Sequence, residues 1–69
     1  MSRLNLLGNN IRKYRKSRGY RQIDLATALD LSEDYICRVE NGLKSLSLKR
    51  LFMLADVLEV KVSDLVNFD

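Results

Sequence analysis

The chain has 69 residues, a net charge of +3, one cysteine and no histidine. At this length we expect a single domain, residues 1–69. A lone cysteine excludes an internal disulfide, and the lack of histidine excludes a zinc site of the Cys/His type, so no metal and no cofactor is expected. No apolar run is long enough to span a bilayer and no secretory pattern is present, so we expect a cytoplasmic protein without membrane contacts.

Basic residues are concentrated at the start of the chain. Residues 1–21 contain seven Lys or Arg and no acid, whereas residues 22–42 contain one base and five acids, a net of −4. A basic first segment suits a polyanionic partner, but charged helical faces are also ordinary solvated surfaces. Charge alone therefore supports a nucleic-acid partner and a plain solvated surface about equally.

Apolar residues recur at helical spacing along the chain and predict short helices with short connections. Gly19 and Gly42 stand where the first and third helices would end in a left-handed residue, and Ser32 and Ser47 would cap the starts of the third and fourth. The sequence therefore predicts an all-α fold of five helices, with the ranges 6–17, 22–29, 33–41, 48–58 and 62–67.

The second and third predicted helices are joined by almost no loop. Their apolar stripes are Leu25, Ala26 and Leu29, then Ile36 and Val39. Two helices joined by so tight a turn must cross at a steep angle, which is the geometry of a helix-turn-helix. In such a motif the second helix, here beginning at Glu33, lies in the major groove of DNA.

Nearly the whole chain resembles the phage-repressor, xenobiotic-response-element type of helix-turn-helix domain. This group includes lambda-type repressors, Cro and restriction-modification controller proteins. The specific features are Gln-x-x-Leu-Ala opening the second helix and Glu-Asn-Gly ending the third, in segments IRKYRKSRGYRQIDLA (11–26), SEDYICRVENG (32–42) and SLKRLFMLADVLEVKVSDLV (47–66). The resemblance implies a five-helix lambda repressor-like fold, binding to double-stranded DNA, and usually a two-fold dimer on a palindromic operator.

The chain departs from the family pattern at several positions. Asp30 replaces the usual turn glycine, Arg21 replaces a capping Ser or Thr, and Glu59 stands where glycine is frequent. More important for function, Glu33 and Asp34 are acidic at positions from which the family reads bases.

Base contacts are predicted for four residues of the third helix. A carboxylate of Glu33 or Asp34 can accept a hydrogen bond from the amine of cytosine, although acids in a first helical turn also simply stabilise the helix dipole. Arg38 suits a bidentate contact to guanine, with an ion pair to Asp34 as the alternative. Tyr35 would touch a phosphate or a thymine methyl group, or else lie at the edge of the core.

Contacts to the DNA backbone are predicted around this helix. In similar proteins the glutamine at position 22 contacts the backbone, at a helix start whose free amides can hold a phosphate. The predicted phosphate contacts are Gln22, Asn41, Lys44, Arg12 and Arg18.

The resemblance also implies a structural ion pair between Arg15 and Glu40. It would be partly buried and would tie the first helix to the end of the third.

The C-terminal end predicts a dimer. It carries more apolar surface than one short helix can bury, and exposed apolar patches mark interfaces. The predicted interface residues are Leu58, Val60, Val62, Leu65, Val66 and Phe68.

The sequence therefore predicts a transcriptional regulator, of repressor or controller type, that binds operator DNA as a homodimer and takes no small-molecule ligand. The alternative is a protein-interaction module of the same fold, antitoxin-like or anti-repressor-like, which the net charge of −4 over residues 22–42 favours. An enzyme is not expected, because the carboxylates Glu33 and Asp34 lack histidine, a glycine loop and a metal-ligand set around them.

Overall fold

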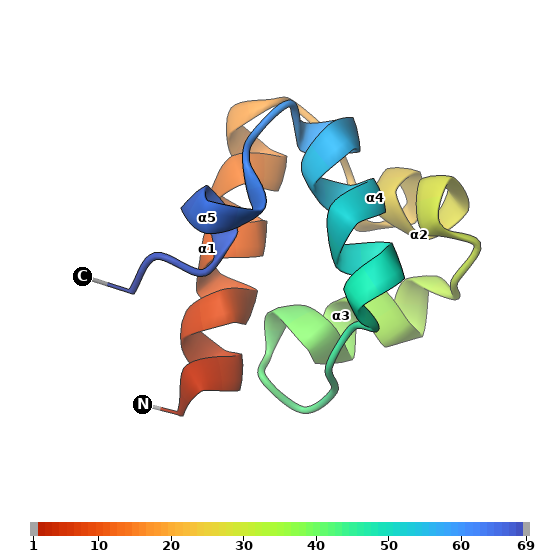
Figure 1. The fold of residues 1–69 in the computed structure, drawn as a ribbon. Coiled ribbons are helices and arrows are strands. Elements are labelled where there is room, and N and C mark those ends of the chain that lie inside the picture. The colour runs from red at the N-terminus through yellow and green to blue at the C-terminus, as the bar shows by residue number, and fades with distance from the viewer. Residues whose placement is uncertain (1, 69) are drawn as a thin grey trace.

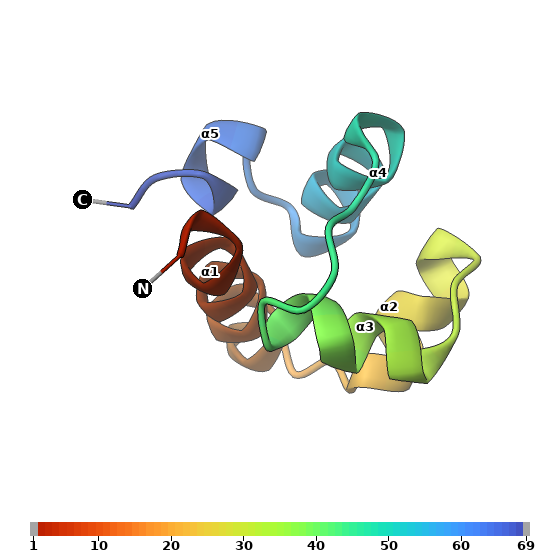
Figure 2. The ribbon, with the colours of Figure 1, turned by 90° about the horizontal axis from the view of Figure 1, so that it is seen from below.

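The computed structural model describes residues 2–68, which form helices and no strand. Figures 1 and 2 show α3 running across the end of the molecule at which α1 begins, with α2 and α4 packed on one side and α5 resting on α1. The predicted all-α architecture is confirmed. Its helices are α1 (Arg3–Ser17), α2 (Gln22–Leu29), α3 (Glu33–Glu40), α4 (Leu48–Leu58) and α5 (Val62–Leu65).

Local side chains set the helix starts. In three helices a serine hydroxyl accepts a hydrogen bond from a backbone N–H of the first turn. These serines are Ser2 for α1, Ser32 for α3 and Ser47 for α4. Arg21 cannot cap α2 in this way. Instead, a carboxylate oxygen of Asp24 accepts the backbone N–H of Arg21 at 2.7 Å, and the same carboxylate pairs with the Arg21 guanidinium at 3.1 Å. The start of α2 is therefore capped in spite of the departure from the family pattern.

Three helix bounds differ from the prediction. Because Ser2 acts as the N-cap, α1 begins at Arg3 rather than at residue 6. Glu40 rather than residue 41 ends α3, since Asn41 is the cap, and α5 ends at Leu65 rather than at residue 67. The sequence pattern misses these ends because they depend on caps and not on apolar spacing.

Side chains from other helices satisfy the carbonyl groups at several helix ends. Such bonds supply partners to groups that have none within their own helix, and a guanidinium at a helix C-terminus also complements the helix dipole. The bonds run from Arg50 Nε to Leu29 O at 3.0 Å, from Arg18 Nε to Leu58 O at 2.8 Å and from Asn10 Nδ2 to Leu65 O at 2.8 Å.

The turn residues Asp30 and Glu59 both adopt the left-handed conformation, each with φ of 57°. Asp30 tolerates this conformation better than most residues, whereas Glu59 takes it where glycine would be free of strain. The tight turn between α2 and α3 therefore forms without its usual glycine.

The core draws on every helix. Ala26 is 1% exposed and lies in α2, the helix that packs most closely against α3. The buried apolar residues are Ile11, Leu25, Ala26, Leu29, Ile36, Val39, Leu54, Ala55, Leu58 and Leu65. This core fixes α3 by its inner face and leaves its other face to solvent.

Gly8 allows α1 to approach the end of α3 closely. A Cβ atom at this buried position would lie 2.6 Å from the carbonyl oxygen of Val39 and would also meet the backbone of Glu40. Only a residue without a side chain fits there, so Gly8 sets the distance between the two helices.

Candidate nucleic-acid interface

The outer face of α3 carries the charged residues that the sequence singles out. Ile36 and Val39, each 2% exposed, face the core, whereas Glu33, Asp34 and Arg38 are exposed. Nε of Arg38 lies 2.8 Å from Oδ2 of Asp34, one helical turn away. Because an exposed ion pair contributes only about 0–1 kcal/mol, both groups can exchange this bond for another partner at little cost.

Tyr35 takes the second of the two roles left open for it. It is half-buried against the core, and its hydroxyl donates a hydrogen bond to the carbonyl oxygen of Ser45. In this structure the hydroxyl therefore braces the loop that connects α3 to α4, and the base contact of Tyr35 stays a prediction.

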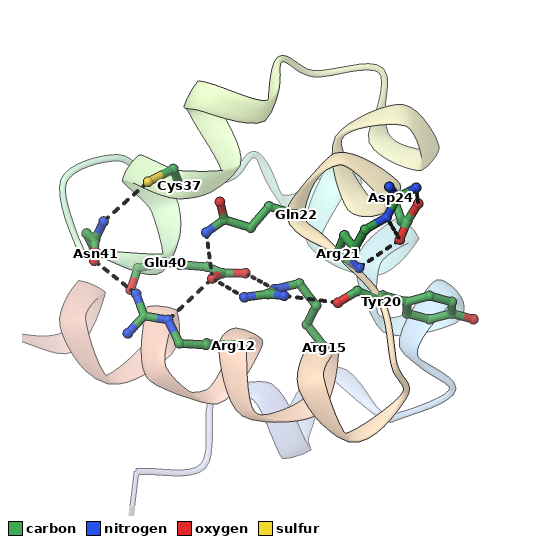
Figure 3. A network of polar contacts seen from close by, with 9 residues as sticks. All are labelled: Arg12, Arg15, Tyr20, Arg21, Gln22, Asp24, Cys37, Glu40 and Asn41. Atoms are coloured by element: carbon green, nitrogen blue, oxygen red, sulfur yellow. Dashed lines mark hydrogen bonds and ion pairs between the residues drawn. The ribbon is translucent and has the colours of Figure 1, made fainter.

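Glu40 is the centre of a polar network that joins α1, α2 and α3 (Figure 3). The carboxylate is 1% exposed and receives two bonds from Arg15, Nε to Oε2 at 2.6 Å and Nη2 to Oε1 at 3.0 Å. Gln22 Nε2 donates to Oε1 at 3.1 Å, and Arg12 Nε lies 3.4 Å from the same oxygen. The structure thus brings Arg15 and Glu40 into a buried bidentate pair and adds Gln22 and Arg12 to it.

The network lowers the pKa of the Glu40 carboxyl below its usual value of 4.5. Burial alone would raise this pKa, but the hydrogen bonds from Arg15, Gln22 and Arg12 and the charge of Arg15 together outweigh the burial. The carboxylate is therefore ionised at neutral pH and its charge is balanced within the fold.

We expect the network to make stability depend on pH. Because the folded-state pKa of Glu40 is depressed, its contribution is fully present above the unfolded-state pKa and is lost as the pH falls through the folded-state pKa. Urea unfolding followed from about pH 7 to about pH 3 should show the loss in the wild type and a smaller loss in Glu40→Gln. Equal losses in the two proteins would contradict this role of Glu40.

Three of the predicted phosphate contacts lie together at the end of α3. Gln22 and Arg12 both reach Glu40, and Nη2 of Arg12 donates to Oδ1 of Asn41 at 2.9 Å (Figure 3). Lys44 is exposed in the loop that follows α3. Gln22, Arg12 and Asn41 therefore lie together at the end of α3, and their contacts to the DNA backbone stay predictions.

Arg18 lies elsewhere. Its guanidinium donates to the carbonyl oxygens of Leu58 and Glu59 at 2.8 and 3.3 Å. Figure 1 shows that the ends of α1 and α4 meet at the upper end of the molecule, whereas α3 lies at the lower end. Arg18 thus caps the end of α4, away from the other residues predicted to contact phosphates, and its own phosphate contact stays a prediction.

The predicted dimer surface is smaller than the sequence indicates. Leu58 and Leu65 are both 0% exposed, so their assignment to a subunit interface is wrong, because they belong to the core of the single chain. Val60 and Val62 are half-buried against that core. Val66 and Phe68 remain exposed, at 43% and 36%.

Two polar residues near α3 escaped the sequence analysis. Asn5 and Asn9 share one face of α1 with Arg12, at spacings of four and three residues. Together with Asn41 they line the same pocket. The helical spacing of these polar residues is the sequence feature from which they could have been found.

Residues 2–68 contain neither a helix that could span a membrane nor a cluster of side chains that could bind a metal ion. Within residues 2–68 no helix combines the length and hydropathy needed to cross a membrane. Nor do the same residues gather three or more His, Cys, Asp or Glu side chains into a group that could hold a metal ion.

Solved structures of known regulators are similar to this one. The restriction-modification controller protein C.AhdI from Aeromonas hydrophila is 31% identical, with a TM-score of 0.83 over 90% of this chain and 94% of that chain. The clp gene regulator ClgR from Corynebacterium glutamicum is 27% identical, with a TM-score of 0.91 over 96% and 70%. The hypothetical transcription factor NHTF from Neisseria is 26% identical, with a TM-score of 0.86 over 96% and 76%.

The sequence comparisons give the family. No curated protein sequence matches the chain. Residues 11–65 match the helix-turn-helix family, and this stretch includes α2, α3, α4 and α5 in full together with the network around Glu40. The chain therefore belongs to the helix-turn-helix family of the xenobiotic-response-element, lambda repressor-like type, whose members are DNA-binding transcription regulators.

Proposed function

We propose that the protein regulates transcription by binding a palindromic operator as a homodimer, with α3 of each copy in the major groove. The observation that carries this proposal is the outer face of α3, where Glu33, Asp34 and Arg38 are exposed and the ion pair between Arg38 and Asp34 lies at the surface. A helix that is packed on the core by its inner face, with side chains nearby that can donate hydrogen bonds to phosphates, fits the major groove.

The polar groups of α3 favour G·C pairs. Arg38 offers a bidentate donor that suits guanine, and Asp34 and Glu33 offer acceptors that suit the amine of cytosine. The Arg38–Asp34 pair opens on binding, and each partner then takes a base in place of the other. We therefore expect the half-site to contain G·C pairs opposite α3.

The acids on α3 repel phosphates, so the attraction to DNA comes from the rest of the surface. Lys13 and Lys16 on α1 and Lys44 after α3 are exposed, and Arg12 reaches the end of α3. Backbone amides at the start of α2, beside Gln22, add donors for a phosphate. This arrangement gives base contacts to α3 and backbone contacts to its surroundings.

The second copy docks, in this proposal, on the exposed part of the C-terminal segment. Val66 and Phe68 are exposed there, and Figure 1 shows this segment beside the N-terminal part of α1. A two-fold dimer would set its two recognition helices about one turn of DNA apart, roughly 34–36 Å.

We expect Arg38→Ala to relax base preference at one symmetric position of the operator. Selection from a random DNA pool with the wild type should enrich a palindrome, and the variant should lose about 1–3 kcal/mol of discrimination at that position because the bidentate contact is gone. Lys61→Ala, an exposed change next to α5, is the control and should leave the preference unchanged.

Two results would contradict the proposal in different ways. An enriched site without two-fold symmetry would argue against the dimer but not against DNA reading by α3. No enriched site at all would instead favour the protein-interaction role, for which the exposed acids Glu33 and Asp34 provide the surface.

A further inference from the structure

The connecting loop, residues 43–46 between α3 and α4, is fixed at both ends by the helices beside it. At its start the backbone N–H of Leu43 donates to the carbonyl oxygen of Arg38 at 2.9 Å, and directly after it Ser47 caps α4. Figure 1 shows this loop at the lower end of the molecule, where α3 also lies. The loop therefore lies at the same end as the helix that is proposed to enter the major groove.

Between these ends, the connecting loop is held by a side chain of α3. The hydroxyl of Tyr35 donates to the carbonyl oxygen of Ser45, and its ring is half-buried against the core. No other hydrogen bond of residues 44–46 is present within residues 2–68. Because the ring is packed, its hydroxyl keeps a fixed place relative to α3 and fixes the middle of the loop there.

The residue that this bond positions is Lys44. It directly precedes Ser45, is exposed and is the only charged residue of the connecting loop. A lysine is a point charge on a flexible stem, so the place where it leaves the backbone sets what its ammonium group can reach. If only part of the molecules hold the loop in the binding conformation, the apparent affinity falls by that fraction, whatever the DNA sequence.

We propose that Tyr35 is a positioning residue of the DNA interface, whose hydroxyl holds the connecting loop so that Lys44 meets the DNA backbone while α3 lies in the groove. This inference rests on the proposed function, which brings DNA to α3. It differs from a base contact of Tyr35 in what it predicts. A base contact would contribute to sequence preference, whereas positioning of Lys44 contributes affinity for all DNA alike.

The bond to the loop is tested first without DNA. Tyr35→Phe keeps the packed ring and removes the hydroxyl, and trypsin cleaves after Lys44. We expect this cleavage to be about two- to tenfold faster in the variant, the factor that corresponds to the loss of one net hydrogen bond, because the loop opens more often. Cleavage after Lys61, between α4 and α5, should keep its rate. An unchanged rate after Lys44, or equal acceleration at both sites, would overturn the inference.

The DNA-binding role is tested with Tyr35→Phe, Lys44→Ala and the double variant, on the selected site and on unrelated DNA. Tyr35→Phe should weaken binding to both DNAs by the same factor, at most about tenfold, without a change in base preference. Lys44→Ala should reduce the slope of log affinity against log salt by about 0.9, the share of one phosphate contact. In the Lys44→Ala background, Tyr35→Phe should cause no further loss, because the residue that it positions is gone.

The matched control is Tyr14→Phe. Tyr14 is also half-buried against the core, and its hydroxyl makes no hydrogen bond within residues 2–68, so affinity and both cleavage rates should stay unchanged. Additive losses in the double variant, or a Lys44→Ala protein that binds DNA as the wild type does, would overturn the inference alone. A changed preference at one base position in Tyr35→Phe would overturn it in favour of the base contact. A wild type that binds no DNA would overturn the proposed function as well.

Discussion

Replacement of Glu40 by alanine is expected to lower the free energy of unfolding by about 3–5 kcal/mol. The carboxylate is 1% exposed, and its removal leaves the buried Arg15 guanidinium without its charge partner. Gln22 and Arg12 lose an acceptor in the same step. Since small domains have total stabilities of roughly 5 kcal/mol at the low end, much of the variant should be unfolded at room temperature, which circular dichroism and urea titration would detect.

The matched control is Asp34→Ala. Asp34 is also a carboxylate bonded to an arginine, Arg38 at 2.8 Å, but both side chains are exposed, 73% and 51%. Its loss should cost only about 0–1 kcal/mol, because water replaces the missing partner. Similar small losses in the two variants would show that burial gives the Glu40 network no special contribution to stability.

Gly8→Ala is the second substitution with a large expected effect. The informative result is whether it raises or lowers the free energy of unfolding. Within a helix, glycine to alanine normally stabilises by about 1 kcal/mol. Here the new Cβ would lie 2.6 Å from the carbonyl oxygen of Val39 and would meet the backbone of Glu40, so α1 must shift. We expect a destabilisation of about 1–3 kcal/mol, measured by urea unfolding.

Lys13→Ala controls for a change of side chain on α1. Lys13 is exposed, and both residues are good helix formers, so the free energy of unfolding should stay within about 0.5 kcal/mol of the wild type. If Gly8→Ala were stabilising instead, α1 and α3 would have room to separate, and the close approach would not be a requirement of the fold.

The candidate site was predictable where it depends on the spacing of residues within one helix. The outer face of α3, with Asp34 and Arg38 one turn apart, follows from helical periodicity and is present as expected. The pocket was not predictable, because Asn5 and Asn9 become relevant only when α1 is placed against Asn41. The role of Tyr35 depended in the same way on where the following loop passes.

The sequence by itself determined the helices, the tight turn at Asp30 and the division of α3 into an inner and an outer face. Periodicity, serine caps and turn residues act over about four residues and can be read directly. Only the tertiary structure decided that Leu58 and Leu65 are core residues, and that Arg18 caps a helix 40 residues away. Such contacts depend on how the helices pack. The local pattern of residue types does not show which distant carbonyl group or apolar face a side chain will meet.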